Sequence, residues 1–283
     1  MKEGKPPWHH DETVGVLVAE YSAEHSLGLP KPLLDYHAHV LATEPLALKM
    51  VPASQGQAMV WLAHVLEAKK VLEIGVYHGF SCMVWSHAVG AQGQVTGLEF
   101  DPEYAARSRT VFAEHGMDNI RVVIGDALTT LAQQVPPAAP DSATDADDDI
   151  ENQPYDIIFI DAQKSDYPVY LRMILENSPS ASSADKDDND GSSSSKKKKR
   201  LLRKGGLIIG DNALRFGAVV DESEANNPFA YNFRQKYYGE NEAGWNNELV
   251  KLREFNREMK ENPRLEAWLC PLWDGVIMAR LKD

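Results

Sequence analysis

The chain has 283 residues and a formal net charge of −13, with 43% hydrophobic and 25% charged residues. This composition is typical of a soluble globular protein that is able to bury a large core, and the acidic balance argues against a nucleic-acid partner. No apolar run is long enough to span a bilayer, and two cysteines, Cys82 and Cys270, are too few for a disulfide framework. We therefore expect a cytoplasmic protein with one domain over residues 1–283 and no membrane partner.

Residues 1–50 are predicted to form an N-terminal helical extension. Apolar residues such as Leu33, Val40 and Leu41 recur there at helical spacing. A further helix is expected to run to Leu66, with Ser54 as its N-cap. Whether these helices pair two subunits into a homodimer stays open.

From Lys70 onward, short strands alternate with helices. The predicted strands are residues 70–74, 94–99, 120–124, 155–160, 206–210, 265–269 and 276–281, and the predicted helices are residues 81–89, 102–115, 127–134, 167–176 and 246–261. This alternation indicates βαβ units, and hence an α/β fold with a parallel sheet and helices on both faces. The short link after residue 270 predicts that the last two strands are antiparallel.

Two segments interrupt this pattern and are predicted to be disordered insertions. Residues 136–153 contain six acidic and no basic residues, and residues 178–199 consist largely of serine, aspartate and lysine. Both segments are too poor in apolar residues to offset the entropy of ordering them. The lysine run at residues 196–199 is interpreted as a solvated loop, with a localisation signal or an anion patch as alternatives.

The first candidate site lies at the turn after the strand 70–74. Glycines such as Gly75 let the backbone approach a ligand closely. The dinucleotide pattern G-x-G-x-x-G is absent, and the acid Glu73 would repel a pyrophosphate, which argues against a nicotinamide dehydrogenase. A cationic or neutral nucleoside fits better, and Glu99, which ends the next strand, is placed to bind ribose hydroxyls. Purely structural carboxylates are the alternative for both acids.

The second candidate site combines Asp161, Asp211 and Asn212, which follow the fourth and fifth predicted strands. Neighbouring parallel strands would bring these ends together, and carboxylate and amide oxygens are ligands that Mg²⁺ prefers. A polar turn is the alternative for Asp211 and Asn212. Lys164 lies three residues after Asp161, where an exposed lysine at the start of a helix is the alternative to a functional one.

Together these motifs resemble a known family. The segments Glu73–Ser81, Ile160–Lys164, Gly205–Asn212 and Asp274–Gly275 are similar to motifs of the cation-dependent class I O-methyltransferases, which include caffeoyl-CoA and catechol O-methyltransferases. The resemblance runs from about Val51 to the C-terminus apart from the insertions. It implies a Rossmann-like sheet of seven mostly parallel strands with a reversed last strand, S-adenosylmethionine (SAM) as methyl donor, and Mg²⁺ or another divalent cation such as Mn²⁺ or Ca²⁺.

The same resemblance implies roles for individual residues. The residues that would bind SAM are Val51, Glu73, Gly75, Tyr77, Ser81, Glu99, Asp126, Ala127 and Asp161. Asp161, Asp211 and Asn212 would bind the metal, and Lys164 would be the general base. The metal would lower the pKa of a chelated catechol hydroxyl, whose oxygen would then attack the methyl group of SAM.

Three departures from the family bear on the acceptor. Gln163 stands where plant members carry a second acid, Arg215-Phe216 replaces an aromatic-polar pair, and residues 221–244 do not match the region that recognises CoA esters. We therefore expect a small free phenol with two ortho hydroxyls as the substrate. Trp273 and Tyr167 are candidates to pack against its ring, with packing in the core as the alternative for each. A metal-independent methyltransferase of another substrate class and a non-catalytic SAM-binding protein are the alternatives.

Overall fold

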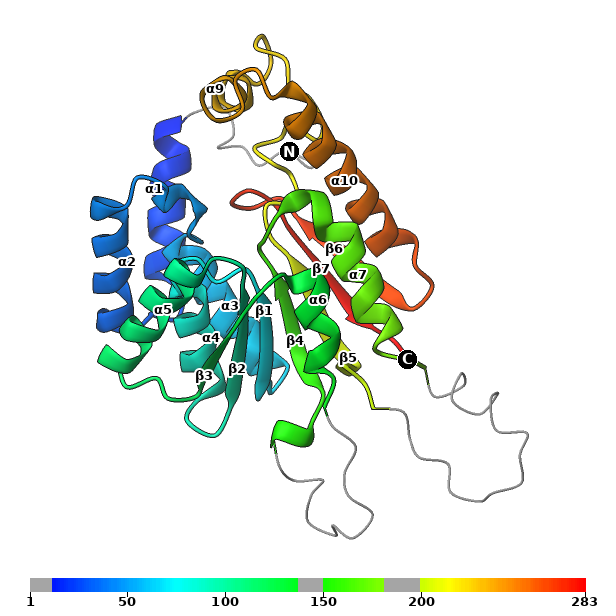
Figure 1. The fold of residues 1–283 in the computed structure, drawn as a ribbon. Coiled ribbons are helices and arrows are strands. Elements are labelled where there is room, and N and C mark those ends of the chain that lie inside the picture. The colour runs from blue at the N-terminus through cyan, green and yellow to red at the C-terminus, as the bar shows by residue number, and fades with distance from the viewer. Residues whose placement is uncertain (1–11, 137–149, 181–198) are drawn as a thin grey trace, which may run out of the picture.

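The computed structural model describes residues 12–136, 150–180 and 199–283, and its centre is a seven-stranded sheet (Figure 1). The strands are β1 (Lys70–Ile74), β2 (Gln94–Glu99), β3 (Ile120–Ile124), β4 (Tyr155–Ile160), β5 (Leu202–Gly210), β6 (Leu265–Cys270) and β7 (Val276–Leu281). Their spatial order is β3-β2-β1-β4-β5-β7-β6. Strands β1 to β5 pair in parallel, whereas β7 runs antiparallel to both β5 and β6. The predicted Rossmann-like sheet with a reversed last strand is confirmed.

Helices cover both faces of the sheet (Figure 1). In chain order they are α1 (Glu12–Glu24), α2 (Lys31–Thr43), α3 (Ala53–Val65), α4 (Phe80–Val89), α5 (Pro102–Glu114), α6 (Ala127–Thr130), α7 (Tyr167–Glu176), α9 (Pro228–Tyr237) and α10 (Glu242–Glu261). Single 3₁₀ turns lie at Ala47–Lys49, Leu131–Gln134, Ile150–Asn152 and Lys164–Asp166. The helices α1 and α2 lie within residues 1–50, and none of the described helices is long and apolar enough to cross a membrane.

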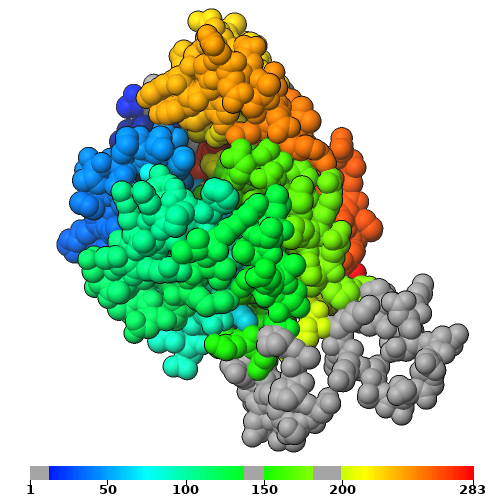
Figure 2. Space-filling view, in the orientation of Figure 1, coloured from blue at the N-terminus to red at the C-terminus, as the bar shows by residue number. Residues whose placement is uncertain are grey.

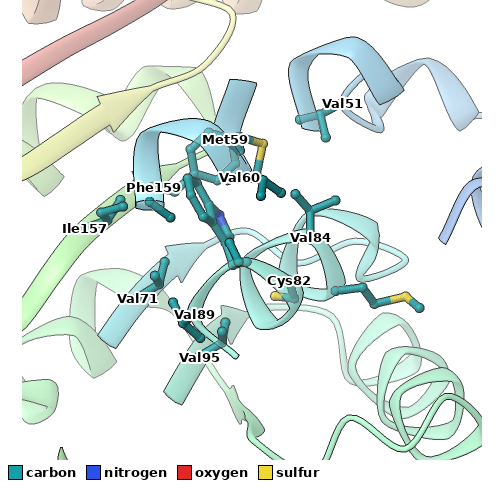
Figure 3. Packing of buried hydrophobic residues seen from close by; sticks show 14 of the residues in the cluster. Val51, Met59, Val60, Val71, Cys82, Val84, Val89, Val95, Ile157 and Phe159 are labelled. Atoms are coloured by element: carbon teal, nitrogen blue, oxygen red, sulfur yellow. The ribbon is translucent and has the colours of Figure 1, made fainter. Parts of the chain in front are cut away.

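Alternate residues of the buried strands face opposite layers of helices. Val71, Ile157 and Phe159 belong to the apolar cluster that also contains residues of α3, α4 and α5, part of which is drawn in Figure 3. Leu72 and Ile158 belong to the second cluster, with residues of α6, α7 and α10. Because successive side chains of a strand point to opposite faces, a run that is apolar throughout is what a strand covered on both sides requires.

Several boundaries differ from the sequence-based expectations. The helix α3 begins after Pro52, which makes no side-chain capping bond, so the prediction of Ser54 as N-cap is wrong. Strand β5 begins four residues earlier than expected. Helix α10 also begins four residues earlier, because the side chain of Asn241 accepts a hydrogen bond from the amide of Gly244 and caps it. The helix α9 was not predicted.

The structure does not describe residues 137–149 and 181–198. Most of each predicted insertion, residues 136–153 and 178–199, therefore lies outside the described residues. At the edges of these segments, Ile150–Asn152 forms a 3₁₀ turn and Ser178 is fully buried. The Ser178 hydroxyl accepts a hydrogen bond from the amide of Leu202 at 2.9 Å, so this serine belongs to the folded domain.

Candidate functional site

A cavity of about 680 Å³ opens at the carboxyl ends of β1, β2, β4 and β5. Ligands bind at this edge in open α/β sheets. The space-filling view shows a recess between the blue N-terminal part of the chain, the yellow and orange segment that includes α9, and the green segment after β4 (Figure 2). The residues that line the cavity come from parts of the chain that are far apart in sequence, from Leu46 to Glu248.

Most of the residues expected to bind SAM or a metal lie at this cavity. Those on its surface are Val51, Gly75, Tyr77, Ser81, Glu99, Asp126, Ala127, Asp161, Lys164 and Asn212. Glu73 and Asp211 lie behind that surface, with 0% and 2% of their residue surface exposed. The fold thus brings all of the predicted site residues into one region.

The turn after β1 is held close to the end of β4. Gly75 has φ +94°, and a Cβ atom there would lie 2.1 Å from the carbonyl oxygen of Asp161, so only glycine fits. One carboxylate oxygen of Glu99 accepts hydrogen bonds from the amides of Val76 and Tyr77, each at 2.9 Å. The other oxygen accepts a bond from a single amide, that of Asp101, at 2.8 Å. Glu99 therefore fixes this turn and keeps one lone pair for a ligand.

Glu73 is a fully buried acid at the same turn. The Ser81 hydroxyl donates a hydrogen bond to Glu73 Oε1 at 2.5 Å, whereas Oε2 has no partner within the described part of the chain. Burial raises the pKa of Glu73 from 4.5 to about 8. The buried Glu73 carboxylate has no cationic partner among the described residues. The ammonium group of an amino-acid ligand would supply one.

The N-terminal extension contacts the same turn. The Tyr36 hydroxyl on α2 donates a hydrogen bond to the carbonyl oxygen of His78 at 2.6 Å, and the ring of His37 lies 3.2 Å from the carbonyl oxygen of Val51. The histidine ring therefore contacts the backbone of the segment that precedes α3.

At the other end of the cavity, Asp126 and Ala127 begin α6. The Asp126 carboxylate caps this helix through the amide of Leu128 at 2.9 Å. Phe100 lines the same end with 76% of its surface exposed, a residue that sequence reasoning did not select. The sequence signal that could have identified it is an aromatic residue directly after Glu99, the acid that ends β2.

Asp161 and Asp211 are brought together by the pairing of β4 with β5. Ile160 lies opposite Gly210 in the parallel register, and the amide of Asp211 donates a hydrogen bond to the carbonyl oxygen of Ile160 at 3.0 Å. Burial, with a further contribution from Asp161, raises the pKa of Asp211 from 3.8 to about 7. The two acids therefore lie close together, and their oxygen donors suit a hard divalent cation.

Asn212 completes this group. It has φ +52°, which turns the chain sharply after β5. Among the described residues, no group of three or more His, Cys, Asp or Glu side chains is arranged to hold a metal ion. A metal at this position would accordingly use the amide oxygen of Asn212 beside two carboxylates.

Lys164 is oriented by two fixed partners. Its Nζ lies 2.8 Å from Asp161 Oδ1 and donates to the hydroxyl of Tyr167 at 2.8 Å. That hydroxyl is itself held at the carbonyl oxygens of Ile160 and Asp211, at 3.0 and 3.1 Å. Only 8% of Lys164 is exposed, so its alternative interpretation as an exposed lysine is wrong. The sequence did not indicate that Tyr167 positions this amine.

The remaining wall comes from the segment after β5 and from α9 and α10. Its lining residues are Arg215, Phe216, Phe233, Tyr237, Tyr238 and Glu248. The two residues proposed from sequence to pack against an acceptor ring lie elsewhere. Tyr167 packs against Phe255 in the core, and Trp273 donates a hydrogen bond to Ser54 Oγ at 3.0 Å. The aromatic wall therefore consists mainly of residues that sequence reasoning missed.

Known proteins are similar to this chain over most of its length. The family model described as O-methyltransferase matches residues 22–178 and 182–282. The O-methyltransferase ankF of Aspergillus thermomutatus is 28% identical over 96% of this chain and 95% of its own length. The catechol O-methyltransferase of Mycobacterium tuberculosis is 29% identical over 82% of this chain and 80% of its own.

The solved structures include a similar fold. The methyltransferase PaMTH1 of Podospora anserina, solved with bound SAH, superposes with a TM-score of 0.72 at 25% identity, over 96% of this chain and 97% of that one. The expectation of an O-methyltransferase enzyme is thereby confirmed. With the family model matching most of its length, this chain belongs to the O-methyltransferase family.

Proposed function

We propose that this enzyme transfers the methyl group of SAM to one hydroxyl of a small ortho-dihydroxy phenol, with Mg²⁺ or a similar divalent cation at Asp161, Asp211 and Asn212. One observation carries the proposal. Two carboxylates and an amide follow neighbouring strands beside the buried amine of Lys164, in the same cavity as the turn after β1. The relatedness to a catechol O-methyltransferase supports the acceptor class.

The turn after β1 would hold SAM. Glu73 Oε2 would accept a hydrogen bond from the ammonium group of the methionine part, which Val51, Gly75, Tyr77 and Ser81 would surround. Glu99 would bind a ribose hydroxyl with its remaining lone pair. Asp126 and Ala127 would border the adenine, and Asp161 would contact both the donor and the metal.

Lys164 would remove the proton from the acceptor hydroxyl. The oxygen would then form a bond to the methyl carbon while the carbon–sulfur bond of SAM breaks, and S-adenosylhomocysteine (SAH) would leave. Asp161 and Tyr167, which contact the lysine amine, would hold it in place for this transfer. A divalent cation bound at the neighbouring oxygens would lower the pKa of the acceptor hydroxyl. The rest of the rate enhancement would come from holding the two substrates in line within the cavity.

The proposal is tested by methyl transfer to catechol and to phenol, in EDTA and after Mg²⁺ is added back. We expect catechol to be methylated, phenol to be a poor substrate, and activity to disappear in EDTA and return with the metal. Lys164→Met should lower kcat by about a hundredfold or more, the usual contribution of a positioned base. Full activity in EDTA would instead support a metal-independent methyltransferase. SAM binding without turnover of either acceptor would support a non-catalytic SAM-binding protein.

A further inference from the structure

The wall of the cavity that faces α9 and α10 contains a buried ion pair that the proposed reaction does not use. Arg215 Nη2 donates to Glu248 Oε2 at 2.9 Å and to the hydroxyl of Tyr238 at 2.8 Å. The two charged side chains are only 11% and 8% exposed. Both line the same cavity as Lys164 and Asn212. A pair of charges therefore stands in the space next to the proposed reaction centre.

Aromatic rings hold the arginine in this position. The central carbon of its guanidinium group lies between 5.2 and 6.0 Å from the centroids of four rings, those of Phe216, Phe233, Tyr238 and Trp245. Cation–π contacts at these distances favour the charged group where it stands. Within the described part of the chain, Arg215 Nε is buried without a hydrogen-bond partner, so the group retains a donor.

Gln163 reaches the same acid from the opposite side. Its Nε2 donates to Glu248 Oε1 at 3.2 Å, so both oxygens of Glu248 accept hydrogen bonds, one from a cation and one from a neutral amide. The three side chains together carry no net charge. A glutamate at position 163 would place a second carboxylate against Glu248.

We propose that Glu248 sets the charge selectivity of the acceptor pocket, so that an uncharged dihydroxy ring is preferred to one that carries a carboxylate or an ammonium group. This inference rests on the proposed function and specifies the substrate class of the same site. A carboxylate on the ring would be repelled by Glu248 and would find Arg215 already paired. An ammonium group would likewise find Glu248 already paired, and either ion would lose its hydration on entry.

The test compares three acceptors with the same dihydroxy ring and different charges: catechol, protocatechuate, which carries a carboxylate, and dopamine, which carries an ammonium group. Their kcat/KM values and their affinities for the SAH-loaded enzyme are measured in the presence of Mg²⁺. The wild-type enzyme should prefer catechol. Glu248→Gln leaves the charge of Arg215 unpaired and should raise the ratio of protocatechuate to catechol by about tenfold, while lowering that of dopamine.

A second variant should shift the charge selectivity in the opposite direction. Gln163→Glu adds a negative charge at an exposed side chain and should shift selectivity toward dopamine by about fivefold, since solvent screens the charge. Glu254→Gln is the matched control, because Glu254 also lies on α10 and pairs with an arginine, Arg172, but does not line the cavity. It should leave the three ratios unchanged.

The outcomes separate this inference from the proposed function. A wild-type enzyme that methylates none of the three rings contradicts the proposed function, while the binding measurements still report charge selectivity. Ratios that are the same in the wild type and in Glu248→Gln, or a wild-type preference for protocatechuate, overturn the inference alone.

Discussion

Individual carboxylates show where this protein is built for a ligand. Glu73 and Asp211 are both buried at the ends of strands, and burial raises their pKa values to about 8 and about 7. An acid that burial removes from water is costly to ionise in the folded chain unless a cation or hydrogen bonds compensate its charge. Acids with such raised pKa values gather at functional sites more often than in structural cores. The two positions coincide with the proposed methionine and metal ends of the site.

Glu73 gives a prediction for the pH dependence of SAH binding. Because its pKa is raised to about 8 in the ligand-free protein, Glu73 holds a proton at neutral pH. The ammonium group of SAH favours the ionised form, so binding should release a proton. Affinity should therefore rise with pH through neutrality and level off above about 8. Calorimetry in two buffers with different ionisation enthalpies measures the released proton directly.

The control for this prediction is Glu73→Gln. This variant should bind SAH about tenfold or more weakly, since it loses a hydrogen bond to a charged group. Its binding enthalpy should no longer depend on the buffer through this residue. A wild-type protein with no buffer dependence near neutral pH would contradict the role given to Glu73.

At the scale of elements, the strands and most of the helices were predictable, whereas helix α9 was not. Strands buried on both faces, such as β1 and β4, appear in the sequence as short continuous apolar runs. The helix α9 has no such signal, because its aromatic residues face the cavity and α10 rather than the main core. Strand order could be inferred only through the family resemblance.

Long-range contacts at the site were also beyond sequence reasoning. Glu248 lies 85 residues from its partner Gln163, and no local pattern connects the two. The incorrect prediction of Ser54 as the N-cap of α3 also arose from a long-range contact. Ser54 looked like a cap from its neighbours in sequence, yet its hydroxyl accepts a hydrogen bond from Trp273, 219 residues away. By contrast, Asp161 and Asp211 were found because each immediately follows a strand.

The ion pair between Arg215 and Glu248 also predicts how firmly α10 is attached to the turn after β5. Arg215→Met should destabilise the protein by about 3–5 kcal/mol, because it leaves Glu248 buried without its cationic partner. The double variant Arg215→Met with Glu248→Leu should recover much of this loss, since no unpaired charge remains. Urea unfolding measures both variants.

The exposed pair on the same helix is the reference for this experiment. Arg172→Met removes the partner of Glu254 and Glu258 at the surface and should cost less than about 1 kcal/mol. If Arg215→Met were no more destabilising than Arg172→Met, or if the double variant were worse than the single one, Arg215 would not hold the two elements together.

At the scale of the whole molecule, the sheet gathers residues from Val51 to Glu248 around one cavity. The strands supply the acids at their carboxyl ends, α2 holds the turn after β1 through Tyr36, and the segment from Arg215 to α10 closes the opposite side. The proposed donor end of the cavity thus contains carboxylates, whereas the proposed acceptor end contains aromatic residues and a neutralised ion pair. The proposed metal ligands follow β4 and β5, next to β1 in the sheet.

The most direct test of this account is a titration of the SAH-loaded protein with Mn²⁺, followed by electron paramagnetic resonance of the free ion. We predict a single tight site per chain that is lost in Asp161→Asn and in Asp211→Asn. The site should be retained in Asp166→Asn, which removes an acid from the same cavity outside the proposed ligand set. Unchanged Mn²⁺ binding in Asp211→Asn would contradict a metal between the ends of β4 and β5.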